Sequence, residues 1–246
     1  MEKPQLRQLT VKRKSLITKH MLRVTLGGAG MEGFPEGRES ANCKLVLPST
    51  GDSPAVRTYT VRNHRPKSAE VDIDFVLHAE HGPASSWALQ AEAGDTIGFA
   101  GPGKVKLVDF SADWFLLVGD MSALPAIGAN IDQLPDDARG HVVLEVIDED
   151  DRQPLGLPEG MEVEWVINPA PHKPGSTLLE AVAGRPWLEG RVAAWVAGES
   201  TITRRIRRYL KQEQRVPRGD LYASGYWQIG LTEDRHQVVK KQEPED

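Results

Sequence analysis

The pattern of the chain changes near residue 110, and this change restricts the available folds more than any other feature. Before that point, short apolar runs are separated by turn residues. After it, apolar runs alternate with amphipathic segments. Two patterns of this kind indicate two domains, and 246 residues are enough for two small ones. We therefore predict one domain over residues 1–109 and a second over residues 110–246.

The first domain has the pattern of a small antiparallel barrel. In the segment Glu70–His78, apolar residues such as Ile73 and Phe75 alternate with polar ones, as in a half-buried strand. A short helix is expected over Gly82–Glu92, with Pro83 in its first turn. Several strands with few helices favour a barrel; the other expected strands are His20–Leu26, Lys44–Leu47, Val56–Arg62 and Asp95–Ala100.

The second domain alternates strand and helix, which indicates a mainly parallel sheet covered by helices. The expected strands are Trp114–Val118, Gly140–Ile147, Met161–Ile167, Arg191–Ala197 and Leu221–Ser224. The expected helices are Ser122–Leu134, with Ser122 as its cap, Thr177–Ala183 and Ser200–Gln214. Ligands of such sheets bind beyond the carboxyl ends of the strands. Those ends are Gly119-Asp120, Asp148–Asp150, Asn168-Pro169, Gly198-Glu199 and Gly225-Tyr226.

Composition and charge exclude several classes of protein. Hydrophobic residues make up 39% and charged residues 26%, a globular balance, and the net charge of −5 argues against a nucleic-acid binder. Apolar runs long enough for membrane insertion are absent, as is a secretory signal, so we expect a cytoplasmic location. The single cysteine, Cys43, excludes an internal disulfide and fits a core position.

The charge is unevenly distributed along the chain. Residues 1–109 hold 15 Lys or Arg and 12 Asp or Glu, whereas residues 110–246 hold 15 and 23. The most basic stretch is Met1–Arg23, which is typical of a solvated strand face and equally fits attraction of an anionic ligand near the first half of the chain.

Two short motifs in the first domain suit a ligand that carries phosphates and an aromatic ring. The Arg57 guanidinium can donate two hydrogen bonds to a pyrophosphate. Tyr59 lies on the same face of the strand and offers an aromatic surface. Gly82-Pro83-Ala84-Ser85 opens a helix, whose free N–H groups suit a diphosphate. Taken alone, the strand motif around Arg57 equally fits an ordinary exposed strand. The Gly82–Ser85 motif equally fits a simple helix cap.

Other motifs are weaker. The glycines Gly28, Gly30 and Gly33 match a dinucleotide fingerprint, but Phe34-Pro35-Glu36-Gly37 follows instead of a helix, which favours a turn. Neither a P-loop nor zinc-ligand spacing occurs, and we expect no metal site.

Taken in chain order, the motifs resemble the siderophore-interacting protein family, flavin-dependent NAD(P)H:ferric-siderophore reductases of the ferredoxin–NADP reductase-like superfamily. The resemblance covers about Val11 to Asp234. It rests on Arg57-Thr58-Tyr59-Thr60-Val61-Arg62, on His78 with Gly82–Trp87, on Gly119–Ile127, on Ala197-Gly198-Glu199 and on Gly225-Tyr226-Trp227. It implies a β barrel plus an α/β domain: a six-stranded antiparallel FAD-binding barrel, then a Rossmann-like parallel sheet that binds NAD(P)H.

The resemblance also implies the flavin contacts. Thr60 is expected near flavin N5, and no side chain is expected to act as an acid or base because the flavin mediates the reaction. Trp87 equally fits a core position. The implied FAD-binding residues are Arg57, Thr58, Tyr59, Thr60, Asp74, Val76, His78, Gly82, Pro83, Ala84, Ser85 and Trp87.

For NAD(P)H, the resemblance implies contacts at the strand ends of the second domain. The residues are Gly119, Asp120, Ser122, Ala123, Pro125, Gly198, Glu199, Tyr226 and Trp227. Two positions depart from the family pattern: Met121 replaces a glutamate, and Gln228 stands where an arginine often follows the tryptophan. The choice between NADPH and NADH depends on cations near the ribose 2′ position, and four arginines favour NADPH, although they equally fit a solvated helix face: Arg204, Arg205, Arg207 and Arg208.

The implied activity is hydride transfer from NAD(P)H to FAD, then single-electron transfer to Fe(III) in a bound ferric siderophore. Candidate contacts for that anionic chelate are Lys44, Arg62, Lys104, Lys240 and Lys241. Two alternatives remain: a flavin enzyme with another acceptor, such as a quinone or free flavin, and a ferric-chelate-binding flavoprotein reduced by a ferredoxin-like protein.

Overall fold

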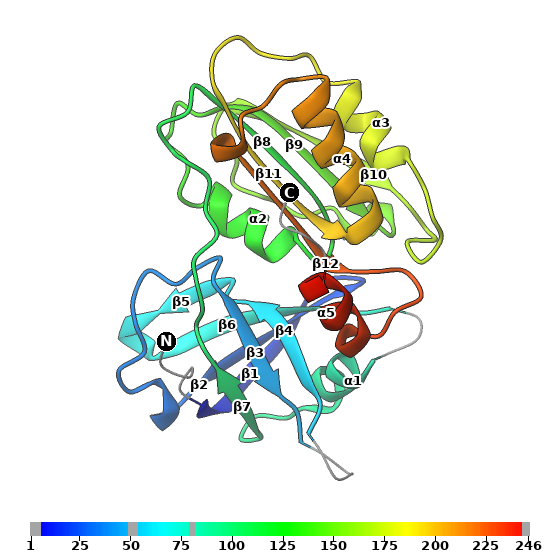
Figure 1. Ribbon diagram of the computed structural model, residues 1–246. Coiled ribbons are helices and arrows are strands. Elements are labelled where there is room, and N and C mark those ends of the chain that lie inside the picture. Colours follow the sequence, from blue (N-terminus) through cyan, green and yellow to red (C-terminus); the bar gives the residue numbers. More distant parts are fainter. Residues whose placement is uncertain (1–5, 49–53, 79–81, 243–246) are drawn as a thin grey trace. The chain divides into compact units, whose positions relative to one another are not determined.

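The computed structural model describes residues 6–48, 54–78 and 82–242, with side chains up to residue 240 (Figure 1). The chain divides into two compact units, residues 1–107 and 108–246. The division falls two residues before the boundary expected from the sequence. No helix among the described residues is long and apolar enough to cross a membrane.

The first unit is an antiparallel sheet of seven strand segments in the order β4-β3-β7-β1-β2-β6-β5. The strands are β1 (Leu6–Thr18), β2 (Met21–Gly27), β3 (Asn42–Val46), β4 (Val56–Thr60), β5 (Asn63–Arg65), β6 (Glu70–Val76) and β7 (Thr96–Ala100). One α-helix, α1 (Pro83–Gln90), and two 3-10 turns, η1 (Ala29–Met31) and η2 (Pro66–Ser68), complete this unit.

The sheet closes on itself because its two edge strands are halves of one segment. β4 pairs with β3 and β5 pairs with β6, and only Val61 and Arg62 separate the halves. The Val61 amide still donates to Ala41 and the Arg62 amide to Asp72, which carries the segment from one partner strand to the other. The expected six strands become seven because this strand breaks as it changes partner.

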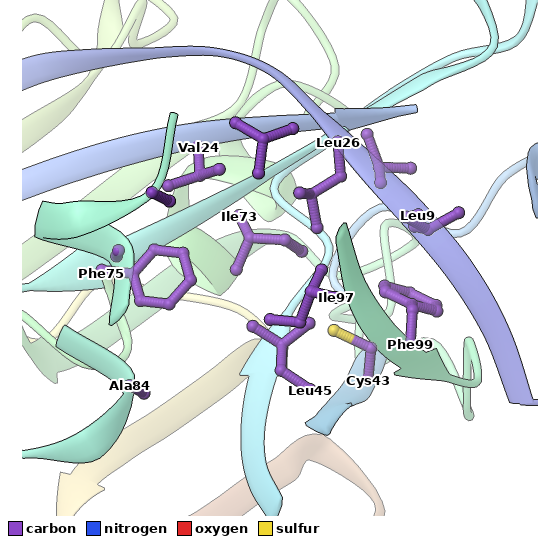
Figure 2. Close-up of a cluster of buried hydrophobic side chains, with 14 of the residues drawn as sticks. Leu9, Val24, Leu26, Cys43, Leu45, Ile73, Phe75, Ala84, Ile97 and Phe99 are labelled. Carbon is purple, nitrogen blue, oxygen red and sulfur yellow. The ribbon is translucent and has the colours of Figure 1, made fainter. Parts of the chain in front are cut away.

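Alternating apolar residues form the core of the first unit (Figure 2). Leu9, Val24, Ile73 and Phe99 are fully buried there, and Figure 2 shows them converging from several strands. Cys43 is 2% exposed in the same cluster, and burial raises the pKa of its thiol. The predicted core role of this cysteine is confirmed.

A buried ion cluster holds the closing strand in place. Asp72 on β6 accepts hydrogen bonds from Arg65 at 2.6 and 2.7 Å, from Asn63 at 3.0 Å and from Thr25 at 2.8 Å. Burial alone would raise the pKa of Asp72, but these hydrogen bonds outweigh it and lower the pKa to about 2. The cluster ties β2 and β6 to β5, where the barrel closes.

The second unit is a five-stranded parallel sheet in the order β10-β9-β8-β11-β12. Its strands are β8 (Trp114–Asp120), β9 (Arg139–Val146), β10 (Gly160–Ile167), β11 (Val192–Glu199) and β12 (Leu221–Trp227). Its helices are α2 (Leu124–Ile131), α3 (Thr177–Ala183), α4 (Ser200–Gln212) and α5 (Glu233–Gln242), with 3-10 turns η3 (Glu149–Asp151) and η4 (Arg218–Asp220). α2 packs on β8, whereas α3 and α4 pack against each other and the sheet (Figure 1). The chain reverses its direction across the sheet between β8 and β11, which makes this the switch point where ligands bind.

Some elements differ from the sequence-based expectation. β1 and α5 were not predicted, because the basic residues of β1 and the polar residues of α5 obscure their periodicity. α2 begins at Leu124, so the expectation that Ser122 caps it is wrong. The Ser122 hydroxyl donates to Asp120 instead.

Candidate functional site

In the first unit, the strand β4 presents its side chains on two sides. Arg57 and Tyr59 pair across the ladder with the core residues Leu45 and Cys43, so both leave the strand on the core side. Thr58 and Thr60 leave on the opposite side; Thr58 accepts a hydrogen bond from Lys44 at 3.2 Å, and Thr60 is 9% exposed. The alternation expected from the sequence therefore holds in the folded strand.

No side chain among the described residues caps the start of helix α1. Gly82 precedes it in an extended conformation, and a Cβ there would meet no atom within 4 Å. The buried Ser85 hydroxyl donates to the Gly82 carbonyl at 3.1 Å. An uncapped first turn that faces open space fits a diphosphate, because its N–H groups need acceptors.

Three aromatic rings join β4, β6 and α1. The ring centroids of Tyr59 and Phe75 lie 4.5 Å apart, and those of Phe75 and Trp87 lie 5.9 Å apart. Tyr59 and Trp87 are only partly buried against the core. This packing accounts for Trp87 as a core residue and links Tyr59 to α1 through the Phe75 ring.

The residues on or just after β6 that were expected near the flavin differ in how far their side chains are engaged by partners within the barrel. Both carboxylate oxygens of the buried Asp74 accept hydrogen bonds from Arg23, at 2.7 and 2.8 Å. The half-buried Val76 pairs with Met21, and His78 is exposed. The Asp74 side chain therefore serves the barrel, which leaves the backbone of β6 to contact a ligand.

In the second unit, two glycines allow the strand ends at the switch point to approach closely. A Cβ on Gly119 would lie 2.7 Å from Ala123 and 2.8 Å from the Ala197 carbonyl. Gly198 has φ +144°, and a Cβ there would lie 2.5 Å from the Asp120 carboxylate. Both positions therefore require glycine.

Asp120 connects three strand ends at this edge. One carboxylate oxygen accepts from the amide and hydroxyl of Ser122, and the other accepts from the Glu199 amide and from Trp227 Nε1, both at 2.8 Å. Asp120 is 6% exposed. Its carboxylate therefore orients the Trp227 indole as well as the turn before α2.

Glu199 and Ser200 shape the beginning of α4. The Glu199 carboxylate accepts from the amides of Thr201 and Ile202 and from the Ile229 amide. The Ser200 hydroxyl donates to the Trp227 carbonyl at 2.9 Å, so the ring Nε2 of His236, also at 2.9 Å, donates to Ser200. These bonds fix the polypeptide on both sides of the predicted dinucleotide edge.

The remaining predicted contacts at this edge are partly buried. Ala123 and Pro125 are buried in and before α2. The Tyr226 ring packs edge-on against Trp195, with centroids 6.3 Å apart, and burial raises the pKa of its phenol. Tyr226 therefore remains neutral, as suits an aromatic packing surface.

The basic residues predicted to contact substrate fall in both units. Lys44 and Lys104 are exposed, and Arg62 donates to Asn63 at 3.0 Å. Lys240 on α5 donates to Ser224 and to the Gly225 carbonyl, both at 2.8 Å. Lys241 lies in α5, but its side chain is outside the described part of the chain.

The glycine-rich segment forms a turn. Its middle residues make up η1, and the Arg7 guanidinium donates to the carbonyls of Gly30, Glu32 and Gly33. An open cavity of about 520 Å³ borders this turn. The interpretation of these glycines as a structural turn agrees with the structure.

Sequence reasoning missed Glu145 and His236. Glu145 lies at the carboxyl end of β9, one residue from the end of the strand, so the strand-end rule could have found it. His236 is buried, but it lies in a segment whose polar composition indicated no packed element.

An antiparallel barrel followed by a five-stranded parallel sheet is the ferredoxin reductase-like fold. Phthalate dioxygenase reductase has this fold; its structure aligns with a TM-score of 0.65 over 89% of this chain and 68% of its own, at 14% identity.

Within that class, the chain belongs to the siderophore-interacting protein family. Residues 49–106 match the siderophore-interacting FAD-binding domain, and residues 112–230 match the siderophore-interacting protein model. Ferric vibriobactin reductase ViuB of Vibrio cholerae is 36% identical, over 96% of both chains. The siderophore-interacting protein SipS from Aeromonas hydrophila aligns with a TM-score of 0.87 at 33% identity, over 97% of this chain and 98% of its own. The predicted family and fold class are confirmed, and the match to the FAD-binding domain model confirms FAD as a predicted cofactor.

Proposed function

We propose that the chain is an FAD-dependent NAD(P)H:ferric-siderophore reductase. The observation that carries the proposal is the combination, in one chain, of a barrel whose helix α1 has no side-chain cap among the described residues with a parallel sheet whose strands end at a topological switch point. The first feature fits a flavin dinucleotide and the second a pyridine nucleotide. Similarity to a ferric vibriobactin reductase supports a ferric siderophore as the acceptor.

The residues of the first unit would hold FAD by complementary means. Arg57 and the first turn of α1 supply donors for the diphosphate, Tyr59 supplies an aromatic face, and Thr60 supplies a hydroxyl. FAD, when bound, would accept the hydride of NAD(P)H and release the two electrons singly, so that each coenzyme reduces two ferric chelates.

The residues of the second unit would position the coenzyme. Gly119 and Gly198 let the strand ends at the switch point approach each other closely, and Asp120 fixes the Trp227 indole at the same edge. Lys44, Arg62, Lys104, Lys240 and Lys241 are the candidate contacts for an anionic chelate. We place the reaction in the cytoplasm, where Fe(II), bound more weakly by hard oxygen ligands than Fe(III), would be released.

The test is anaerobic stopped-flow mixing of FAD-loaded protein with NADH and with NADPH, followed by addition of a ferric siderophore and a ferrous-specific chelator. We expect loss of flavin absorbance with at least one coenzyme, then formation of the coloured ferrous complex. A flavin that neither coenzyme bleaches would instead indicate a protein donor, such as a ferredoxin-like protein. Bleaching without ferrous product would indicate another acceptor.

The substitution Arg57→Ala tests the flavin site. Loss of a charge-assisted pair of donors should weaken FAD binding about 10- to 100-fold, measured by fluorescence titration of the apoprotein. Lys67→Ala removes the same charge from an exposed position on η2 and should leave the affinity unchanged. Equal affinities for both variants would remove Arg57 from the site.

A further inference from the structure

The carboxyl ends of β9 and β10 carry a polar pair that nothing above has used. Glu145 lies near the end of β9, and Asn168 follows β10, with its amide donating to the Val146 carbonyl at 2.8 Å. The Asn168 side-chain oxygen accepts from the Ala170 amide, so its NH₂ group makes the side-chain hydrogen bond with Glu145. The Glu145 carboxylate is therefore oriented at the edge of the sheet.

The surroundings of Glu145 are acidic. Asp120 is its partner in the parallel register between β8 and β9. Burial raises the pKa of Glu145, the Asn168 hydrogen bond lowers it, and the charges of Asp120 and Glu199 raise it further. The chain continues from β9 into Asp148, Glu149 and Asp150. A further anionic group at this edge would meet like charges in a half-buried setting.

The basic residues of α4 begin one turn inside the helix. α4 begins at Ser200 and rises about 1.5 Å per residue, so Arg204 and Arg208 stand roughly 6 and 12 Å along its axis. Arg205 donates to the Gly175 carbonyl at 3.0 Å. Among the described residues, Lys173, exposed in the loop after β10, is the lysine or arginine that follows Asn168 most closely in the sequence.

We propose that Glu145, oriented by Asn168, accepts hydrogen bonds from the adenosine ribose, so that the protein prefers NADH to NADPH. A carboxylate accepts a hydrogen bond from the 2′-hydroxyl of NADH, whereas its charge repels the 2′-phosphate of NADPH. The dinucleotide fold commonly places such an acidic residue about 20 residues after its glycine turn, and Glu145 follows Gly119 by 26. The inference rests on the proposed function, since it assumes a pyridine nucleotide at this edge.

The test is calorimetric titration of the FAD-loaded protein with NAD⁺ and with NADP⁺, which needs no turnover. We expect NAD⁺ to bind at least about tenfold more tightly. Glu145→Gln should reduce that ratio about fivefold or more, mainly through tighter binding of NADP⁺. Glu162→Gln, the same change at the exposed amino-terminal end of β10, should leave the ratio unchanged.

The outcomes separate this inference from the proposed function. If NADP⁺ binds more tightly than NAD⁺, and Lys173→Gln removes that preference, the inference is overturned. Lys173 would then be the residue that binds the 2′-phosphate. An unchanged ratio in a folded Glu145→Gln protein would also overturn it. Absence of binding by both nucleotides would overturn the proposed function together with the inference. The kcat/KM ratio for NADH and NADPH should follow the binding ratio.

Discussion

At the scale of single residues, buried carboxylates do most of the positioning in both units. Asp74 holds Arg23, Asp120 holds the Trp227 indole, and Glu199 caps α4. Each is at most 6% exposed, so an unpaired charge at any of them would be costly. These residues connect segments distant in sequence, and their identity as carboxylates gave no indication of which partner each would find.

Asp72 gives a prediction about acid stability. Its pKa of about 2 lies below the ordinary value of 3.8, so its carboxylate stabilises the fold above about pH 4, and this is lost as the pH falls toward 2. Asp72→Asn should lower the melting temperature by about 2–8 °C at pH 6, from a loss of about 1–2 kcal/mol, and much less near pH 2.5. The exposed Asp136→Asn should melt like the parent. If Asp72→Asn lowered the melting temperature equally at both pH values, the Asp72 carboxylate would not be the source of the pH dependence.

At the scale of elements, the ends of strands and helices carry the candidate sites. The first turn of α1 is uncapped, β4 breaks where it changes partner, and five parallel strands end at one edge. In each case the regular part of the element is buried while its end leaves polar groups to be satisfied. The candidate sites are thus concentrated where secondary structure stops.

The helix α5 gives a prediction at this scale. His236→Ala removes the hydrogen bond to Ser200 and the buried ring, so α5 should open more easily from β12. Hydrogen exchange of the α5 amides should accelerate about tenfold, which corresponds to about 1.4 kcal/mol. Val238→Ala on the same helix changes a side chain that is 56% exposed and should accelerate exchange far less. Equal acceleration in both variants would show that His236 does not hold the helix.

At the scale of the whole molecule, the chain pairs two units with separate cores. Residues 6–107 pack around an antiparallel barrel, and residues 108–242 pack around a parallel sheet. Under the proposed function, each unit supplies one half of the redox chemistry, because the barrel would hold the flavin and the sheet would hold the coenzyme.

Each ligand should therefore slow hydrogen exchange in one unit: FAD in the first and NAD⁺ in the second. FAD at about 100 times its Kd should stabilise its site by about 2.7 kcal/mol, and NAD⁺ at the same ratio should act similarly. Hydrogen exchange should slow in residues 56–60 and 82–90 with FAD, and in residues 119–125 and 198–202 with NAD⁺. Protection by FAD confined to the second unit would reverse the assignment of the two sites.

The fold class followed from local pattern, and most predicted elements are present within two or three residues of their expected ends. Thr177–Ala183 coincides with α3, because its apolar spacing alone defines that helix. β1 could not be found this way, because its many exposed basic residues hide the alternation of a strand. Its pairing with β2 and β7 forms only in the folded chain. The Ser122 cap failed because the Asp120 carboxylate, two residues earlier, takes the hydroxyl proton.

The sequence by itself determined the two-unit architecture and the family, and it supplied the predicted flavin and dinucleotide contacts, because periodicity and short motifs are local properties. The tertiary structure decided what each polar side chain contacts. It committed Asp74 to Arg23, paired Glu145 with Asn168 and joined Asp120 to Trp227, 107 residues away. Such partners meet only when the strands pair, and burial then requires each carboxylate to find donors wherever the fold brings them.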